Sequence, residues 1–147
     1  MSERQVFRYP LRVRYQETDQ MGVVYHANYL TWFEIGRTEW IRALGFSYAS
    51  MEEAGLLLPV TDVEVKYVQP ARYDDELELQ VRLVECSHIR IGFKYEIMRI
   101  RDQVLLVTGG TRHVWVNARW KPARLDRALP ELYSHIKAQL TDYSDRS

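Results

Sequence analysis

The sequence has little of several features on which other classes of protein depend. Its single cysteine, Cys86, excludes an intrachain disulfide and favours a reducing compartment. Lys plus Arg and Asp plus Glu number 20 each, so the charge gives no reason to propose a nucleic-acid partner. No apolar run approaches the roughly 20 residues that cross a bilayer, and the N-terminus carries charge where a secretory signal has an apolar block. We therefore expect a cytoplasmic protein without a membrane span.

Motifs for cofactors, metals and common nucleophiles are also missing. The pair Gly109-Gly110 lies inside a strand pattern with no helix after it, so it does not form a phosphate-binding loop. The four histidines have no metal-ligand spacing on a helix. No serine stands in a nucleophile elbow, and no local signature marks Cys86 as a nucleophile. We expect neither a metal nor an organic cofactor.

What the chain does contain is enough apolar sequence for one packed domain. It has 147 residues, of which 46% are hydrophobic, a share that supports a real core and argues against disorder. Neither an internal repeat nor a low-complexity run or linker divides it. We expect a single domain over residues 1–147.

Alternating apolar and polar residues predict most of the strands. This period of two is found over residues 11–15, 62–67, 76–83 and 89–97. In the first of these, the pattern places Tyr15 on the core-facing side. The segment 104–116 is apolar on both faces, which favours a central strand or one at an interface. Its Gly109-Gly110 pair predicts either a bulge or a close backbone approach.

A helical period appears over residues 28–44, where the apolar stripe consists of Tyr29, Phe33, Gly36, Trp40 and Leu44. Gly45 is a typical helix stop, and Gly36 would let the helix backbone approach its neighbour closely. Glu34 and Arg37 could form a surface pair. Shorter helices are expected over 48–54 and after Pro130. Short links between strands imply antiparallel pairing, so we predict an α+β fold with a curved sheet around the long helix.

The stretch YQETDQMGVVYHANYL, residues 15–30, has two interpretations. In the first, Asp19 simply begins a β-turn that ends at Gly22. In the second, Asp19 is a catalytic carboxylate that faces the N-terminus of the helix beginning near His26. Free N–H groups at such a terminus can hold an oxyanion, while a carboxylate attacks or deprotonates water. Without a metal or a triad, these groups suit a thioester better than an amide, because a thiolate leaves readily.

The same stretch resembles a known family. The spacing of Tyr15, Asp19, Gly22, Val24, Tyr29, Glu34 and Arg37 is similar to that of hotdog-fold acyl-CoA thioesterases of the 4-hydroxybenzoyl-CoA thioesterase family, and Val23 to Tyr29 is closest to the YbgC-like branch. The likeness extends from about residue 11 to 116, including 73–75 and 113–116. It implies a five-stranded antiparallel sheet wrapped around one long helix, to which the apolar pattern after Pro130 adds a C-terminal helix.

The resemblance also implies roles for individual residues. Asp19 matches the catalytic carboxylate, and His26 matches the residue whose N–H polarises the thioester carbonyl; Tyr15 is a candidate for a role beside Asp19. Further candidates for substrate contacts are Gly22, Val24, Tyr25 and Asn28. Some members of the family hold the coenzyme A nucleotide with a basic cluster after the turn at 85–88. Here only His88 and Arg90 stand in that place, so the chain departs from the family pattern.

We expect the chain to assemble with copies of itself, and two alternative activities remain open. The resemblance implies homodimers, often paired into tetramers, with active sites at the dimer interface. An apolar strand 104–116 and four tryptophans, at positions 32, 40, 115 and 120, agree with a large interface. One alternative is a hydratase or dehydratase on the same fold, although its His-and-acid pattern is not found. The other is a non-catalytic protein that binds acyl thioesters.

Overall fold

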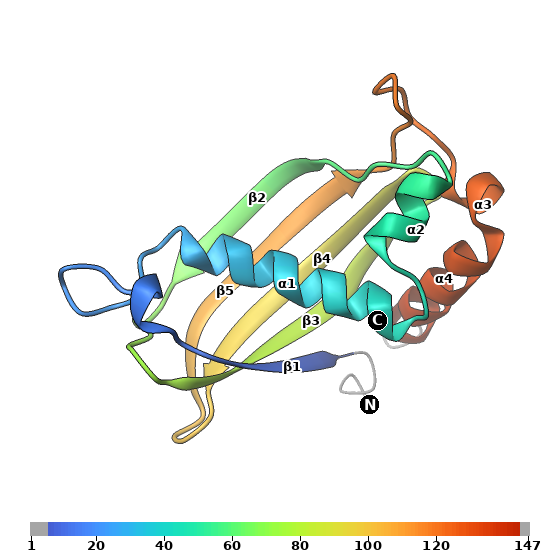
Figure 1. Cartoon of the computed structure of the whole chain (residues 1–147). Coiled ribbons are helices and arrows are strands. Elements are labelled where there is room, and N and C mark those ends of the chain that lie inside the picture. Colours follow the sequence, from blue (N-terminus) through green and yellow to red (C-terminus); the bar gives the residue numbers. More distant parts are fainter. Residues whose placement is uncertain (1–5, 145–147) are drawn as a thin grey trace.

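The computed structural model describes residues 6–144, with side chains through residue 140, and its main element is a five-stranded antiparallel sheet (Figure 1). The strands follow the spatial order β1-β3-β4-β5-β2, and every neighbouring pair is antiparallel. The edge strands are therefore β1 and β2. The strand bounds are β1 Phe7–Arg12, β2 Val60–Tyr67, β3 Glu76–Cys86, β4 Arg90–Arg99 and β5 Val104–Val114.

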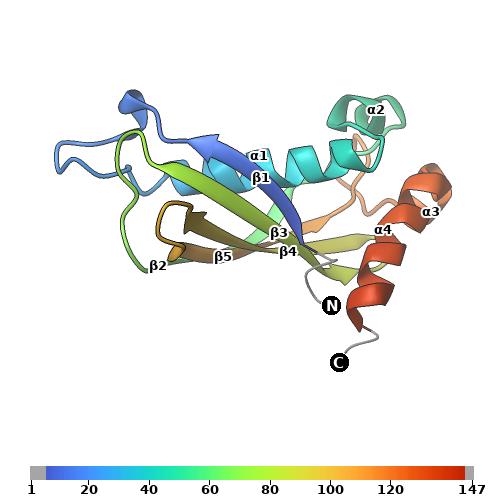
Figure 2. The same cartoon turned by 90° about the horizontal axis from the view of Figure 1, so that it is seen from below.

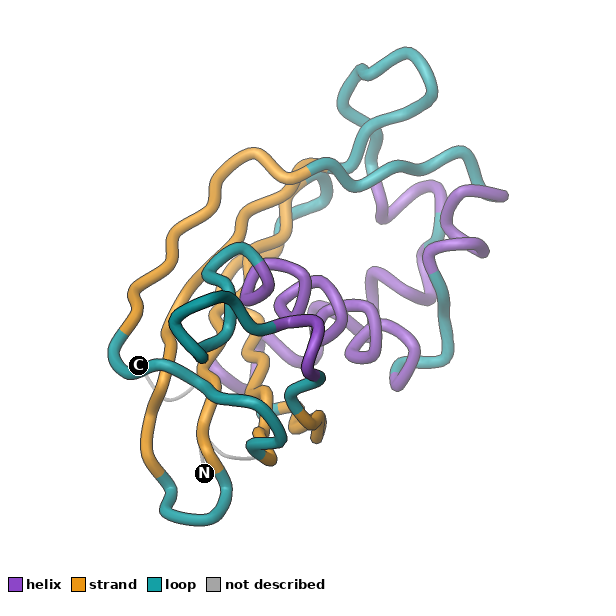
Figure 3. Tube along the Cα trace, turned by 60° about the vertical axis from the view of Figure 1, so that its left-hand side comes forward, coloured by secondary structure: helices purple, strands orange, loops and turns teal. Residues whose placement is uncertain are grey.

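The long helix α1 (Asn28–Ala43) crosses one face of this sheet, and Figure 2 shows it lying over the strands along its whole length. The helices α2 (Tyr48–Glu53), α3 (Leu125–Ala128) and α4 (Pro130–Ser144) gather near the far end of α1. Figure 3 shows the helices to one side of the strands. The α+β arrangement predicted from the periodicity and from the resemblance is confirmed.

The core lies between α1 and the inner face of the sheet. Period-two alternation puts the apolar side chains of β3 and β4 on that face, and the helical stripe of α1 packs on them. The side chains at the centre are all less than 2% exposed: Trp32, Phe33, Ile41, Leu77, Leu79, Ile91, Phe93, Tyr95, Ile97 and Trp115. Burial of this apolar surface is the main source of the fold's stability.

Two glycines let α1 approach the sheet. A Cβ on Gly36 would lie 2.9 Å from Cγ2 of Val81, and a Cβ on Gly109 would lie 2.5 Å from the Phe33 ring. The predicted close approach at both positions is therefore confirmed. The alternative of a bulge at Gly109 is wrong, because the pairing of β5 with β2 and with β4 continues in register through that residue.

Two expectations are wrong: that Tyr15 faces the core, and that the four tryptophans indicate an interface. Strand β1 ends at Arg12, and Tyr15 is 75% exposed at the start of the 3-10 helix η2 (Tyr15–Glu17) instead of facing the core. The buried residue of this segment is instead Glu17, whose carboxylate accepts hydrogen bonds from Arg14 and Trp32. Three of the four tryptophans already lie in the chain's own core, so they are no sign of an interface; only Trp120, at 66% exposure, lies outside it.

Candidate functional site

Asp19 lies in a tight turn on the loop between β1 and α1. Its carboxylate Oδ1 accepts a hydrogen bond from the Met21 N–H at 2.8 Å, and its carbonyl oxygen accepts from the Gly22 N–H at 3.0 Å. Gly22 has a φ of +79°, a conformation that favours glycine. The predicted turn therefore exists, and it leaves the second carboxylate oxygen, Oδ2, without a hydrogen-bond partner in the described part of the chain.

The buried side chain of Glu17 holds this loop against α1. Its Oε1 accepts from the Arg14 N–H at 2.8 Å and its Oε2 from the Trp32 Nε1–H at 3.0 Å. The Glu17 carbonyl oxygen accepts from the Asn28 side-chain amide at 2.8 Å and from the Tyr25 N–H at 2.9 Å. Burial opposes ionisation of Glu17, but these bonds and the Arg14 charge outweigh it and lower the pKa below its ordinary value. An ionised carboxylate thus ties the Asp19 loop to the first two turns of α1.

Helix α1 begins directly after His26 and Ala27, as predicted. The N–H groups of Asn28, Tyr29 and Leu30 donate to carbonyl oxygens of the preceding turn. Within residues 6–144, those of His26 and Ala27 donate to no protein acceptor. Two neighbouring free donors therefore stand at the positive end of a 16-residue helix, an arrangement that attracts a developing negative charge.

A cavity of about 330 Å³ opens between this helix start and the end of β2. Its walls are mostly apolar, and Asp19 and His26 provide its chemically active groups. The lining residues are Asp19, Met21, Val23, Val24, His26, Tyr29, Tyr67, Val68, Gln69 and Pro70. A mostly apolar concave site with few polar groups is typical of small-molecule binding.

Tyr67 belongs to this site although no sequence motif marks it. Its hydroxyl donates to the His26 carbonyl oxygen at 3.3 Å, and its ring lies edge-on to the His26 ring, with centroids 6.2 Å apart. Tyr67 also contacts the buried Tyr29, whose pKa is raised by burial. The only signal was its place as the last apolar residue of a predicted strand, which says nothing about what lies across from it.

The predicted site residues divide into two groups in the structure. Asp19, His26 and Val24 line the cavity together. Tyr15, Gly22, Tyr25 and Asn28 are not part of its wall. Tyr15 packs edge-on against Tyr73 at 5.7 Å between ring centroids, and the Tyr25 ring lies on His26 at 4.6 Å. These four residues lie in or beside the loop that carries Asp19, Val24 and His26, and they support its conformation.

His88 and Arg90 lie at the opposite end of the sheet from Asp19 within one chain. Residue Arg72, just before β3, is bridged to Val23 of the Asp19 loop, whereas His88 follows the end of β3. The 11 residues of β3 span about 36 Å. Within one chain, these two side chains are therefore remote from the Asp19 cavity.

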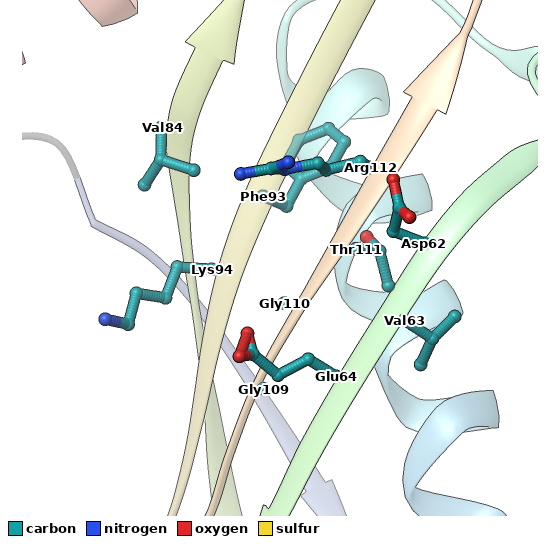
Figure 4. A pocket seen from close by; sticks show the side chains of 10 residues that line it. All are labelled: Asp62, Val63, Glu64, Val84, Phe93, Lys94, Gly109, Gly110, Thr111 and Arg112. Carbon is teal, nitrogen blue, oxygen red and sulfur yellow. The ribbon is translucent and has the colours of Figure 1, made fainter.

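A separate hollow of about 410 Å³ lies on the face of the sheet away from α1 (Figure 4). Gly110 has no side chain to fill it, and charged side chains of both signs surround it: Asp62, Glu64, Lys94 and Arg112. It contains none of the predicted site residues. Its mixed charge gives no preference for a ligand of one sign.

The described residues lack two further features. Among the side chains of residues 6–140, no group of three or more His, Cys, Asp or Glu is placed to hold a metal ion. In the same part of the chain, each helix is too short or too polar to cross a membrane.

Comparison with known proteins identifies the family to which the chain belongs. The thioesterase-like superfamily matches residues 13–140. The putative acyl-CoA thioesterase YneP of Bacillus subtilis is 36% identical over 125 residues, covering 84% of this chain and 90% of that protein. The acyl-CoA thioesterase YbgC of Haemophilus influenzae is 32% identical over 133 residues, covering 89% and 96%.

A solved structure agrees with these sequence relatives. The crystal structure of a DHNA-CoA thioesterase from Staphylococcus aureus superposes with a TM-score of 0.85 at 39% identity, covering 93% of this chain and 94% of that one. The sheet wrapped around α1 is thus the hotdog fold that the resemblance implied. With a family match over residues 13–140 and relatives above 30% identity along most of their length, the chain belongs to the thioesterase-like superfamily.

Proposed function

We propose that this protein hydrolyses acyl-CoA thioesters to a free acid and coenzyme A. The observation that carries the proposal is the meeting of Asp19 and His26 in one cavity, where the N–H groups of His26 and Ala27 have no protein partner. The names of YneP and YbgC, which describe acyl-CoA thioesterases, support the same activity. The lone unpaired thiol of Cys86 supports a cytoplasmic location.

The proposed chemistry starts with the thioester carbonyl at the start of α1. Its oxygen accepts hydrogen bonds from the free N–H groups, which stabilise the oxyanion formed on attack. Asp19 acts in one of two ways: it attacks the carbonyl carbon and forms an anhydride that water then hydrolyses, or it takes a proton from the water that attacks. In both routes the C–S bond breaks, and the thiolate leaves and is protonated to the thiol of coenzyme A.

The proposed active assembly is a homodimer formed through β2. This edge strand exposes both faces, and its apolar side chains Val60, Val63 and Tyr67 are each at least 42% exposed. Unpaired edge strands of this kind readily pair with another chain. Two copies of β2 related by a two-fold axis run antiparallel, so the Val60 end of one strand lies beside the Tyr67 end of the other. That pairing brings the partner's His88 end of the sheet towards the Asp19 cavity, in agreement with a nucleotide contact from His88 and Arg90.

The experiment that tests the activity is an assay of free thiol with a panel of acyl-CoA esters. A thioesterase releases one thiol for each ester consumed, for at least some acyl groups. A dehydratase changes the absorbance of the enoyl group without releasing thiol, and a binding protein does neither. Absence of thiol release across aliphatic and aromatic esters would contradict the proposal.

A further inference from the structure

A second cavity of about 330 Å³ lies at the other end of the side of α1 that faces β2. It is enclosed by the second half of α1, by α2 and by the segment that enters β2. Most of its wall is apolar, and its lining residues are Glu34, Arg37, Tyr48, Met51, Glu52, Leu56, Leu57, Leu58, Pro59 and Val60. None of them takes part in the chemistry described above.

Arg37 is the half-buried cation in this wall, and its partners are neutral. Its Nη1–H donates to the Tyr95 hydroxyl at a long 3.5 Å, and its guanidinium also contacts the Tyr48 hydroxyl. Burial raises the pKa of both phenols, so neither supplies a negative charge. Among the described residues, no carboxylate oxygen lies within 4.0 Å of the Arg37 nitrogens. The expected surface pair with Glu34 is therefore not formed.

The groups behind Arg37 do not neutralise it either. The Tyr95 hydroxyl is 2.7 Å from the Thr111 hydroxyl, which is 2.8 Å from His113 Nε2. His113 is 1% exposed, and burial together with the Arg37 charge lowers its pKa to about 4, so it is neutral near pH 7. This buried chain of neutral groups holds the guanidinium in place. A partly desolvated cation without a counter-charge is costly, and an anion from outside would relieve that cost.

Residues of α1 and β2 line both cavities. The Asp19 cavity is lined by His26 and Tyr67, and the Arg37 cavity is lined by Val60, at the opposite end of β2. Between them, Val63 of β2 is 50% exposed. The 11 residues from His26 to Arg37 correspond to about 16 Å along the helix axis. An acyl group attached at the Asp19 end would have to pass the exposed Val63 on this side of α1 to reach Arg37.

We propose that Arg37 binds a carboxylate at the far end of the acyl group, so that the protein prefers acyl groups that end in an anion. This inference rests on the proposed thioesterase activity and specifies its substrate class. A guanidinium matches a carboxylate in geometry as well as charge, which makes such pairs among the strongest polar contacts. Glu34 lines the same cavity but is exposed, so water screens its repulsion of the ligand.

The test compares chain-matched substrates on the full-length protein and its variants. The kcat/KM values are measured for adipoyl-, suberoyl- and sebacoyl-CoA and for hexanoyl-, octanoyl- and decanoyl-CoA. For at least one chain length we expect the ester with the terminal carboxylate to be preferred, and Arg37→Met to lower that preference by about 10- to 100-fold. Arg42→Met is the control, because Arg42 lies on the same helix but pairs with Glu39 at the surface; it should keep the preference. Arg37→Lys, which retains the charge without the fork, should keep only part of it.

A binding measurement separates this inference from the activity itself. Free suberate is titrated into the parent and into Arg37→Met, whose folding is checked by circular dichroism. Binding to the parent that is lost in Arg37→Met supports the cavity as an anion site even when no ester is cleaved. Hydrolysis of the unsubstituted esters with no preference for the terminal carboxylate overturns the inference and leaves the thioesterase activity standing. An equal preference in the parent and in Arg37→Met overturns it as well.

Discussion

At the scale of single residues, the carboxylate that organises the loop is not the one proposed to react. Glu17 makes the buried hydrogen bonds, to Arg14 and Trp32, and Asp19 keeps one oxygen free. The sequence pointed to Asp19 because turn chemistry and family spacing are local. It could not point to Glu17, because the donor from Trp32 stands 15 residues away and only the folded helix brings it near.

Replacing Glu17 by Gln is expected to lower the free energy of unfolding by about 1 to 3 kcal/mol at neutral pH. The carboxylate accepts three N–H hydrogen bonds through two oxygens, whereas an amide has one acceptor oxygen and turns its NH₂ towards a donor. Urea unfolding of the variant and the parent measures the difference. Glu39→Gln, which loses only a surface pair with Arg42, is the control and should change stability little.

The pKa of Glu17 fixes how that difference changes with pH. Its folded pKa lies below the ordinary value of 4.5, so its contribution to stability is complete above the unfolded pKa and is lost as the pH falls through the folded pKa. The gap between parent and Glu17→Gln should therefore narrow in acid. A gap that is constant or grows towards low pH would contradict an ionised Glu17.

His113 gives a second pH dependence with its own window. Its pKa falls from 6.5 to about 4 on folding, so the folded protein binds fewer protons than the unfolded chain between these values. The contribution of the neutral His113 ring to the free energy of unfolding is thus complete above pH 6.5 and is lost as the pH falls towards 4. We expect His113→Phe to lose less stability than the parent over this range, measured by urea midpoints at matched pH. Parallel curves for the two proteins would show that His113 does not titrate there.

At the scale of elements, periodicity predicted which helices and strands exist better than it predicted where each one ends. The helix expected over 28–44 is observed at Asn28–Ala43, and each strand lies within a few residues of its predicted range. The failure at Tyr15 has a local cause: alternation in the sequence continued past Arg12, but β1 has only six residues paired with β3 before the chain turns into η2. Pairing partners, and not the pattern alone, decide where a strand ends.

The contact between α1 and β5 is expected to be intolerant of even one methyl group. In Gly109→Ala the new Cβ would meet the Phe33 ring at 2.5 Å and the Glu64 carbonyl oxygen at 2.8 Å. We expect a loss of about 1 to 3 kcal/mol in unfolding free energy, as for an overpacked core. Thr108→Ala, the preceding residue on the other face, serves as the comparison. A Gly109→Ala protein as stable as the parent would mean that α1 can move away from the sheet at little cost.

At the scale of the whole molecule, the sequence alone could not separate the chain's own core from an interface. Aromatic residues are common in protein cores and in interfaces, so their number does not distinguish the two. Here Trp32, Trp40 and Trp115 belong to the core. The interface that we propose instead is β2, one of the two edge strands that only the strand order identifies. The positions of His88 and Arg90, at the other end of the sheet from Asp19 in one chain, fit a nucleotide contact only in the proposed dimer.

We expect light scattering to give a mass of at least twice the 17.5 kDa of one chain. Val63→Lys, which places a charge in the middle of the exposed strand, should shift the protein towards monomer and lower thiol release together. Lys66→Ala, also on β2, is the control for a change without added charge. A monomeric parent with full activity would rule out a site that needs a partner.

The proposed hydrolysis depends most directly on the Asp19 carboxylate. Asn at this position keeps the shape and the turn, but it neither attacks a carbonyl nor takes a proton at neutral pH. The measurement is kcat and KM of Asp19→Asn on the best acyl-CoA ester, with folding and mass matched to the parent. We predict that kcat falls by about 10² to 10⁴ while KM changes far less, because the cavity and the free N–H groups at the start of α1 still bind the ester. A folded Asp19→Asn variant that hydrolyses the ester within a few-fold of the parent rate would contradict the assignment and leave Asp19 as a turn residue.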